Sequence, residues 1–532
     1  MRKTFFITLV TAAIAIPALA QQNAAPATSA PGAVQLTVDE AVKLALDHNV
    51  DLSARRLDPQ ISDTAVAAAA GAFKPAVNTA LNQNDQLQPP SGVLFPIATR
   101  TNVLTTTAGM AQMLPWYGTS YAVSWTAAHT DSNSILNSFN PLVQSGLNVT
   151  VSQPIVRNLA IDPAREQLAT SRIDRDIADT SLREAIVTTV ASTKAAYWNL
   201  AAFRAAVAAR QSSLDLAQEL VRVNKAKVDV GQSPPLDLVS AEAEVAADQE
   251  QLIIAQTAVK QAQDQLRLLI FDPTDRAAWN LSLELIDSPP IATLAPDMDA
   301  AVTTALRDRT DLQRARKDIE MAQTTLKFTG NQKLPDVRLN ASYSANALGG
   351  TQVLRDFSAG FPGTLLGAGA TTPFGSVLNQ LFSVNYPTWT AGVSVSYPLG
   401  ESTQDANYAR ARLERTQSDE RLKSAEGRVI QQVRNAAWNI EMNAKRIETT
   451  RAARELAEQR LDAEGKRFDV GMSTSFLVIQ AQRDLAQART NELSAILAYD
   501  LSLVAFEAIQ EAPVGGPAAI ATGPVGASLV GR

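Results

Sequence analysis

TVDEAVKLALDHNVDLSARR, residues 37–56, has a counterpart 260 residues later, where residues 297–316 read DMDAAVTTALRDRTDLQRAR. Eight positions are identical in this alignment, from Asp39 and Asp299 to Arg56 and Arg316. A second set of matches has a shift of 240: WN at 198–199 returns at 438–439, and DVG at 229–231 returns at 469–471. A period of this length is far beyond the roughly 20–50 residues of solenoid repeats. The chain therefore consists of one unit of about 240–260 residues that occurs twice.

The N-terminus has the pattern of a secretory signal peptide over residues 1–20. Arg2 and Lys3 precede a short apolar stretch, and Pro17-Ala18-Leu19-Ala20 provides small residues for cleavage. We therefore expect an exported protein. Residues 21–36 are interpreted as a flexible leader and residues 512–532, rich in Gly, Pro and Ala, as a flexible tail.

Composition excludes several classes of protein. The chain has no cysteine and two histidines, which leaves no thiolate metal site and few imidazole ligands. Its formal charge of −6 becomes −8 without Arg2 and Lys3, and this argues against a nucleic-acid partner. After the signal no apolar run is long enough for a spanning helix.

Each repeat, 37–290 and 291–511, is predicted to open with a helix. The first helix runs from Thr37 to about Phe73, with Thr37 and Glu40 as a capping box, and its counterpart covers 299–332. A strand follows each of them, at about 75–85 and 335–345, and a second strand precedes the next helix, at about 146–154 and 390–398. Apolar and polar residues alternate with period two in all four segments.

An extra hairpin is expected at about 103–130 because Tyr121, Val123 and Trp125 alternate after Gly118. We place this hairpin in the external loops.

Two long helical hairpins complete the repeats, at about 162–270 and 404–510. The first arm of each has about 65 residues, with apolar positions at seven-residue spacing, which indicates coiled-coil packing in a rod of about 100 Å. The shorter second arm and the opening helix, placed end to end, would together match the length of one long arm.

Four strands at one end of such rods cannot close by themselves, and open sheet edges are not tolerated in hydrocarbon. We therefore expect several chains to share one barrel in an oligomeric outer-membrane channel with a long periplasmic tube.

The chain resembles the TolC family of outer-membrane efflux proteins over residues 37 to about 510. The motifs are the paired repeat starts, the exits VSQP at 151–154 and VSYP at 395–398, and the two VG turns. The resemblance implies a mainly α fold with membrane β structure: long antiparallel coiled-coil helices in an α-helical barrel, and four strands per chain in a trimeric 12-stranded β-barrel. It also implies a homotrimer in the outer membrane of a Gram-negative bacterium, contacting outer-membrane lipid, a periplasmic membrane-fusion adaptor and an inner-membrane pump or ABC transporter.

The two helix turns resemble the adaptor-docking tips of this family. The residues concerned are Val230, Gly231, Leu236 and Asp237 in the first repeat, and Val470, Gly471, Phe476 and Leu477 in the second. Each glycine can equally be a simple helix C-cap.

The periplasmic gate is predicted beside these tips, at Asp229, Asp469, Phe468 and Ser473. Phe468 and Ser473 occupy positions where the family can carry a tyrosine and an arginine. We therefore expect a gate based on packing and carboxylate repulsion, whereas the alternative for the two aspartates is a solvated last helical turn.

We expect the channel to act in tripartite efflux, with two alternatives. The exit duct of a type I protein secretion system would use the same parts, and a structural periplasmic coiled-coil protein would need no amphipathic strands. The sequence has no nucleophile elbow, P-loop or zinc-protease motif, so we expect no enzyme activity, catalytic residue, cofactor or metal site.

Overall fold

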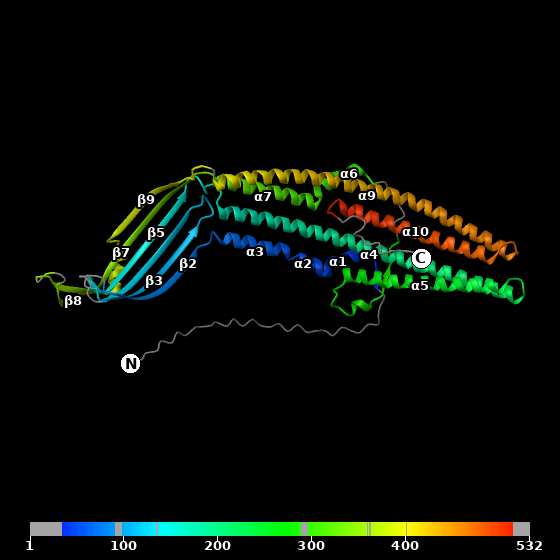
Figure 1. Cartoon of the computed structure of the whole chain (residues 1–532), viewed down its shortest axis with the longest axis horizontal. Helices are drawn as coiled ribbons and strands as arrows, with labels where there is room; N and C mark the ends of the chain where they lie inside the picture. The colour runs from blue at the N-terminus through cyan, green and yellow to red at the C-terminus, as the bar shows by residue number, and fades with distance from the viewer. Residues whose placement is uncertain are drawn as a thin grey trace, which may run out of the picture.

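The computed structural model describes residues 34–90, 98–134, 137–288, 296–358, 360, 363–400 and 402–513. The predicted signal peptide, most of the leader and nearly all of the tail lie outside these residues. The molecule is elongated, with a β-sheet at one end and helices extending from it to the other end (Figure 1).

The helices repeat in two sets. In chain order the first set is α1 (Val38–His48), α2 (Val50–Arg55), α3 (Asp58–Gly71), α4 (Pro163–Asp229) and α5 (Pro235–Ile270). The second set is α6 (Met298–Asp308), α7 (Thr310–Gln332), α9 (Thr403–Asp469) and α10 (Ser475–Ile509). A short 3₁₀ turn, η1 (Ala278–Asn280), and one further helix, α8 (Phe374–Phe382), have no counterpart in this scheme.

Local sequence explains where the opening helix begins and breaks. The Thr37 side chain accepts a hydrogen bond from the Glu40 backbone N–H, and the Glu40 carboxylate accepts one from the Thr37 backbone N–H. The predicted capping box is therefore present. Asn49 ends α1 and caps α2, with its Oδ1 accepting from Leu52 N at 2.9 Å. Pro59 lies in the first turn of α3, where its missing N–H has no cost. The single helix expected over 37–73 is therefore three helices.

The two long helices have the same length. Both α4 and α9 contain 67 residues, about 100 Å at 1.5 Å per residue. Asp162 caps α4 by accepting from Arg165 N at 2.8 Å, and Ser402 caps α9.

The half-length helices lie beside the long ones in two tiers. Near the sheet, neighbouring helices contact in the order α3–α4–α7–α9; farther away the order is α5–α4–α10–α9 (Figure 1). Each level of the molecule is therefore a layer four helices wide.

The largest apolar core lies where the two tiers meet. A small parallel sheet of β1 (Val34–Leu36) and β6 (Leu283–Leu285) packs there, so the predicted leader ends in a strand. Tyr197 is fully buried, and its hydroxyl donates to the Leu36 carbonyl at 2.9 Å. Trp198 packs edge-on against Tyr197, whereas its counterpart Trp438 is half exposed in the single chain.

The large sheet contains β2 (Ala76–Gln88), β3 (Thr99–Met113), β4 (Ser120–Ser132), β5 (Phe139–Pro154), β7 (Asp336–Asp356), β8 (Thr364–Thr372) and β9 (Pro387–Ser396). All pairs are antiparallel, in the order β2–β3–β4–β5–β7; β9 pairs with the part of β7 nearest the helices and β8 with its distal part.

The expectation of four strands per chain is wrong for this structure. The extra hairpin, β3 and β4, lies inside the sheet between β2 and β5 and not in external loops. Six strands therefore extend side by side from the helical end of the sheet. Within this hairpin the period-two signal is visible only in β4, because β3 is rich in Thr and shows little apolar alternation.

Candidate functional site

The two helix turns lie together at the end of the molecule farthest from the sheet (Figure 1). One joins α4 to α5 and the other joins α9 to α10. One apolar cluster holds the two turns side by side. It contains Leu220 and Ala241 of the first hairpin and Phe468, Val478 and Ile479 of the second. We call this end, residues 220–241 and 464–480, the tip.

Each turn is a glycine-terminated helix C-cap. Gly231 has φ +74° and Gly471 has φ +79°, in the left-handed region that only glycine enters without strain. Their N–H groups donate back to Val228 O at 2.9 Å and Phe468 O at 3.2 Å. The C-cap interpretation is therefore confirmed. A Cβ added at either glycine would meet nothing within 4 Å, so the space outside both turns is open.

Apolar side chains are exposed around these open turns. Leu236 is 71% exposed and Phe476 is 69% exposed, and Val230, Val470 and Met472 are exposed to a similar degree. Leu477 is also exposed, whereas Asp237, in the first turn of α5, is half-buried. The predicted docking residues thus form one surface, since both turns face the same end of the molecule.

Phe468 lies inside the chain. It is 6% exposed within the tip cluster, and the Lys227 ammonium lies 3.4 Å from its ring centroid in a cation–π contact. Lys227 Nζ also donates to Phe468 O at 2.8 Å. In the single chain Phe468 therefore joins the two hairpins and does not face a pore.

Ser473 also has a partner within its own hairpin. Its hydroxyl donates to Glu464 Oε1 at 2.5 Å, which fixes the turn between α9 and α10. A charge-assisted bond of this kind is stronger than a neutral one. Of the four predicted gate residues, these two stabilise the tip itself.

Asp229 and Asp469 are the predicted gate residues that remain exposed. Each is the last residue of its long helix. Among the described residues no ion pair includes either carboxylate, whereas neighbouring cations are engaged: Lys466 pairs with Asp462 and Arg467 with Glu464. Both carboxylates are therefore free to act on solutes or on a second copy of the chain.

Polar contacts that sequence patterns did not indicate link the two hairpins. Buried Asn224 donates to Ser475 Oγ at 2.7 Å. Arg483 of α10 makes a forked ion pair with buried Glu244 of α5, with Nε–Oε1 at 2.9 Å. Glu244 raises the pKa of the Arg483 guanidinium through these hydrogen bonds, and burial together with the Glu244 charge raises the pKa of Asp248. Because the partners lie about 240–250 residues apart, no local pattern could have paired them.

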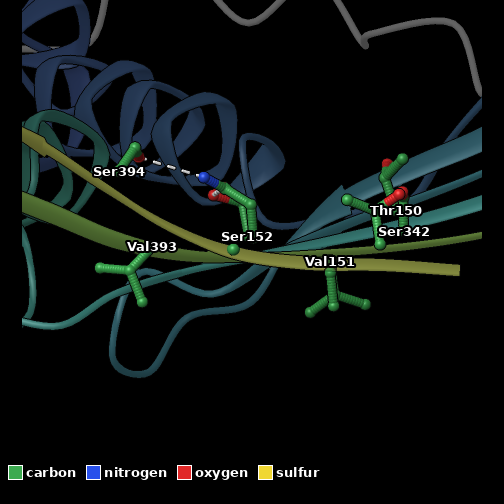
Figure 2. Close-up of a pocket in the computed structure, with 10 residues that line it drawn as sticks. Thr150, Val151, Ser152, Ser342, Val393 and Ser394 are labelled. Carbon is green, nitrogen blue, oxygen red and sulfur yellow. Dashed lines mark hydrogen bonds between the residues drawn. The ribbon is translucent and has the colours of Figure 1, made fainter.

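The sheet presents two chemically different faces. In Figure 2, Val151 and Val393 point to one side, while Thr150, Ser152, Ser342 and Ser394 lie on the other. On the polar side, Ser152 donates to Asn340 Oδ1 at 2.8 Å, and Asn340 Nδ2 donates to Ser394 Oγ at 3.1 Å, which links three strands. The expected alternation therefore becomes an apolar face and a polar face. The polar face is uncharged at these positions and carries the Asp336–Arg338 ion pair, 2.8 Å between Oδ1 and Nε, at the end of β7 nearest the helices.

No helix within the described ranges is long and apolar enough to cross a membrane. No group of three or more His, Asp or Glu side chains in those same ranges is arranged to hold a metal ion.

Comparison with known proteins assigns the class. The outer membrane efflux protein family matches residues 41–270 and 301–509, one segment in each half, and the chain belongs to this family. Members of this family are channels that resemble TolC. No curated protein sequence matches the chain.

Solved structures show the same fold at low sequence identity. The CmeC outer membrane channel of Campylobacter jejuni has a TM-score of 0.63 and 14% identity, with 89% of this chain and 85% of that chain covered. The outer membrane protein VceC of Vibrio cholerae has a TM-score of 0.62 and 15% identity, with coverage of 89% and 96%. A membrane protein from Pseudomonas aeruginosa has a TM-score of 0.65 and 14% identity, with coverage of 89% and 90%.

Proposed function

We propose that three copies of the chain form a channel in the outer membrane of a Gram-negative bacterium and export solutes together with a periplasmic adaptor and an inner-membrane pump. Family membership supports a channel for efflux. The number of subunits, the partners and the removal of residues 1–20 are part of the proposal.

The open sheet carries this proposal. Every residue of the edge strand β2 is exposed, and so is every residue of β9 at the opposite edge. Unpaired edges with an apolar face require partners in a membrane, and a second copy of the chain offers the complementary edge. Closure by identical subunits is a cyclic, head-to-tail arrangement, in which the β2 edge of one copy meets the β9 edge of the next.

The apolar face supplies the surface for outer-membrane lipid, and the long helices supply a tube on the periplasmic side. The exposed tip, with Gly231 and Gly471 in open turns, would then meet the adaptor. The two glycines permit close approach of another backbone, and Leu236 and Phe476 provide apolar contact area.

Fractionation and mass measurement test the proposal. The protein expressed in a diderm bacterium should begin at Gln21, sediment with outer membranes, and give the mass of three chains in native mass spectrometry from detergent. A monomer in the soluble periplasm would contradict it. Cross-linking in cells, followed by identification of the attached proteins, distinguishes an efflux pump from the ABC transporter of a type I protein secretion system.

A further inference from the structure

The inserted hairpin is a full part of the sheet. β3 pairs with β2 without interruption from Ala76–Ala111 to Gln88–Thr99, and β4 pairs with β5 from Ser120–Ser152 to Thr130–Leu142. Neither register contains a bulge. The hairpin thus has the hydrogen bonding of a wall strand pair and not of a loop lying on the surface.

Its faces also match those of the neighbouring strands. Tyr121, Val123 and Trp125 lie directly opposite Val151, Val149 and Leu147 of β5. On the other face, Ser124 and Thr126 lie opposite Asn148 and Gly146. Because paired residues share a face, the apolar face and the polar face seen in Figure 2 both continue across the hairpin. Among the polar-face residues of these two strands from 120 to 152, none is charged.

The tight turn of the hairpin contacts the segments that join the sheet to helices α3 and α4. Thr119 Oγ1 donates to Gln153 Oε1, and Gln153 Nε2 donates to Tyr117 O at 3.1 Å. Gln112 Nε2 donates to Phe73 O, beyond the end of α3, at 2.9 Å. Gly118, with φ +66°, leaves no room for a side chain because a Cβ would lie 2.7 Å from Asn158 O. The turn is therefore seated on the connection between β5 and α4.

The width of the six strands equals the width of the helical layer. Four helices spaced by about 9 Å occupy roughly 36 Å. Strands spaced by about 4.8 Å and tilted by about 40° occupy roughly 6 Å of perimeter each, so six strands occupy about 37 Å and four about 25 Å. With this tilt, the sheet continues the helical tube without narrowing only when the hairpin is included.

We propose that each subunit contributes six strands, so that the trimeric channel has an eighteen-stranded wall in place of the twelve strands implied by the family resemblance. This proposal rests on the trimer of the proposed function. Barrel diameter grows nearly linearly with strand number, so the pore at the level of the sheet is about half again as wide. Its lining is mostly Ser, Thr, Asn and Gln, and the Asp336–Arg338 pair near the helices has no net charge, so the lining selects by size more than by charge, which suits bulky, hydrated solutes as cargo.

Engineered disulfides test the strand order directly, because the chain has no cysteine of its own. Ser124→Cys with Asn148→Cys joins facing residues of β4 and β5 and should form a disulfide within one chain under oxidation. Asn78→Cys with Asn148→Cys is the matched control. Asn78 and Asn148 occupy the same level of β2 and β5, with two strands between them, so they lie about 14 Å apart and should not react. The reverse result in assembled trimers would overturn the six-strand wall.

Deletion of residues 99–132 gives the narrower channel for comparison. It brings β2 and β5 together in antiparallel orientation with matching faces, so the Asn78–Asn148 cysteine pair should now react. Polyethylene glycols added on the extracellular side lower the conductance as long as they are small enough to enter the pore. We expect this size limit to be smaller in this variant than in the parent. An equal size limit would contradict the wider pore. If the deletion variant does not assemble, the disulfide pairs and a strand count by electron cryo-microscopy of the parent decide between eighteen and twelve.

These results also separate the two proposals. A trimer with twelve strands would overturn the inference and leave the proposed function intact. A chain that forms no trimer would overturn the proposed function itself.

Discussion

At the scale of single residues, Gly231 and Gly471 show that one position can serve the fold and leave a surface free. Positive φ makes glycine favourable for the turn, yet nothing within 4 Å excludes a side chain. The effect of a substitution therefore separates into a backbone cost inside the chain and a steric effect on whatever approaches the turn.

Gly471→Trp should block coupling to the adaptor while trimers still assemble. The matched control is Gly471→Asn, since asparagine tolerates the left-handed region and adds little volume. We expect both variants to lose about 1 kcal/mol of local stability, with export strongly reduced only for tryptophan. The measurement is efflux by cells that depend on the variant, together with the amount of trimer. Unchanged export by the tryptophan variant would show that the turn is not a docking site.

Asp500 is a second informative residue, because it is 3% exposed within α10 and its Oδ1 has no hydrogen-bond partner among the described residues. Burial raises the pKa of its carboxyl group to about 7. In the unfolded chain an aspartate ionises near pH 4. Between these pH values the unfolded chain releases this proton and the folded chain keeps it, so the free energy of unfolding falls as the pH rises.

Asp500→Asn should remove this dependence. We expect the variant to gain thermal stability relative to the parent at pH 8, by a free energy no larger than about 4 kcal/mol, and to gain least at pH 4. Thermal melting of both proteins in the same detergent at the two pH values measures the difference. An equal difference at pH 4 and pH 8 would show that Asp500 ionises normally in the folded chain.

At the scale of elements, the sequence predicts most strongly where a signal is long and local. The bounds of α4, α5, α9 and α10 differ by one or two residues from those expected, because about 65 residues with regular apolar spacing and a following glycine define a helix well. The opening helices break at Asn49, whose side chain caps α2, and at Arg309, whose backbone is extended and caps α7 without a side-chain hydrogen bond. Breaks of this kind depend on a few atoms and leave no long pattern in the sequence.

The sheet and the tip contacts were harder to predict for physical reasons. Strand order depends on pairing between distant segments, and β3 carries little apolar alternation by which to recognise it. The Asn224–Ser475 and Glu244–Arg483 contacts join side chains from different repeats. A helical pattern gives the face on which such a residue lies but not the partner that meets it.

Lys227 should hold the two tip hairpins together, since it bonds to Phe468 O and covers the Phe468 ring. Lys227→Met retains the aliphatic packing but removes the charge and the donor. We expect a local loss of about 1 kcal/mol, seen as faster amide hydrogen exchange over residues 464–480. Lys225→Met is the matched control, because Lys225 is exposed on the same helix turn. Equal exchange in both variants would mean that Lys227 contributes nothing to the junction.

At the scale of the whole molecule, the two ends differ in charge. The polar face of the sheet offers little electrostatic selection because its Asp336 and Arg338 pair with each other, whereas the tip carries the exposed carboxylates of Asp229 and Asp469. In a trimer the tip contributes six of them, at the end where the proposed tube meets the periplasm. Charge selectivity should therefore arise at the tip and size selectivity at the sheet.

The double variant Asp229→Ala with Asp469→Ala tests this division. Carboxylates brought together around an opening favour bound cations, so the native trimer should prefer cations and should be blocked by divalent ions. We expect the double variant to lose most of both properties, while the polyethylene glycol size limit at the extracellular side stays the same because the sheet is untouched. Single-channel conductance in planar bilayers provides both measurements. Glu219→Ala with Asp462→Ala is a charge-matched control, because these exposed carboxylates already pair with Arg222 and Lys466 and should affect ion preference far less. Cation preference and divalent block that persist in the Asp229 and Asp469 double variant would place the constriction elsewhere in the tube.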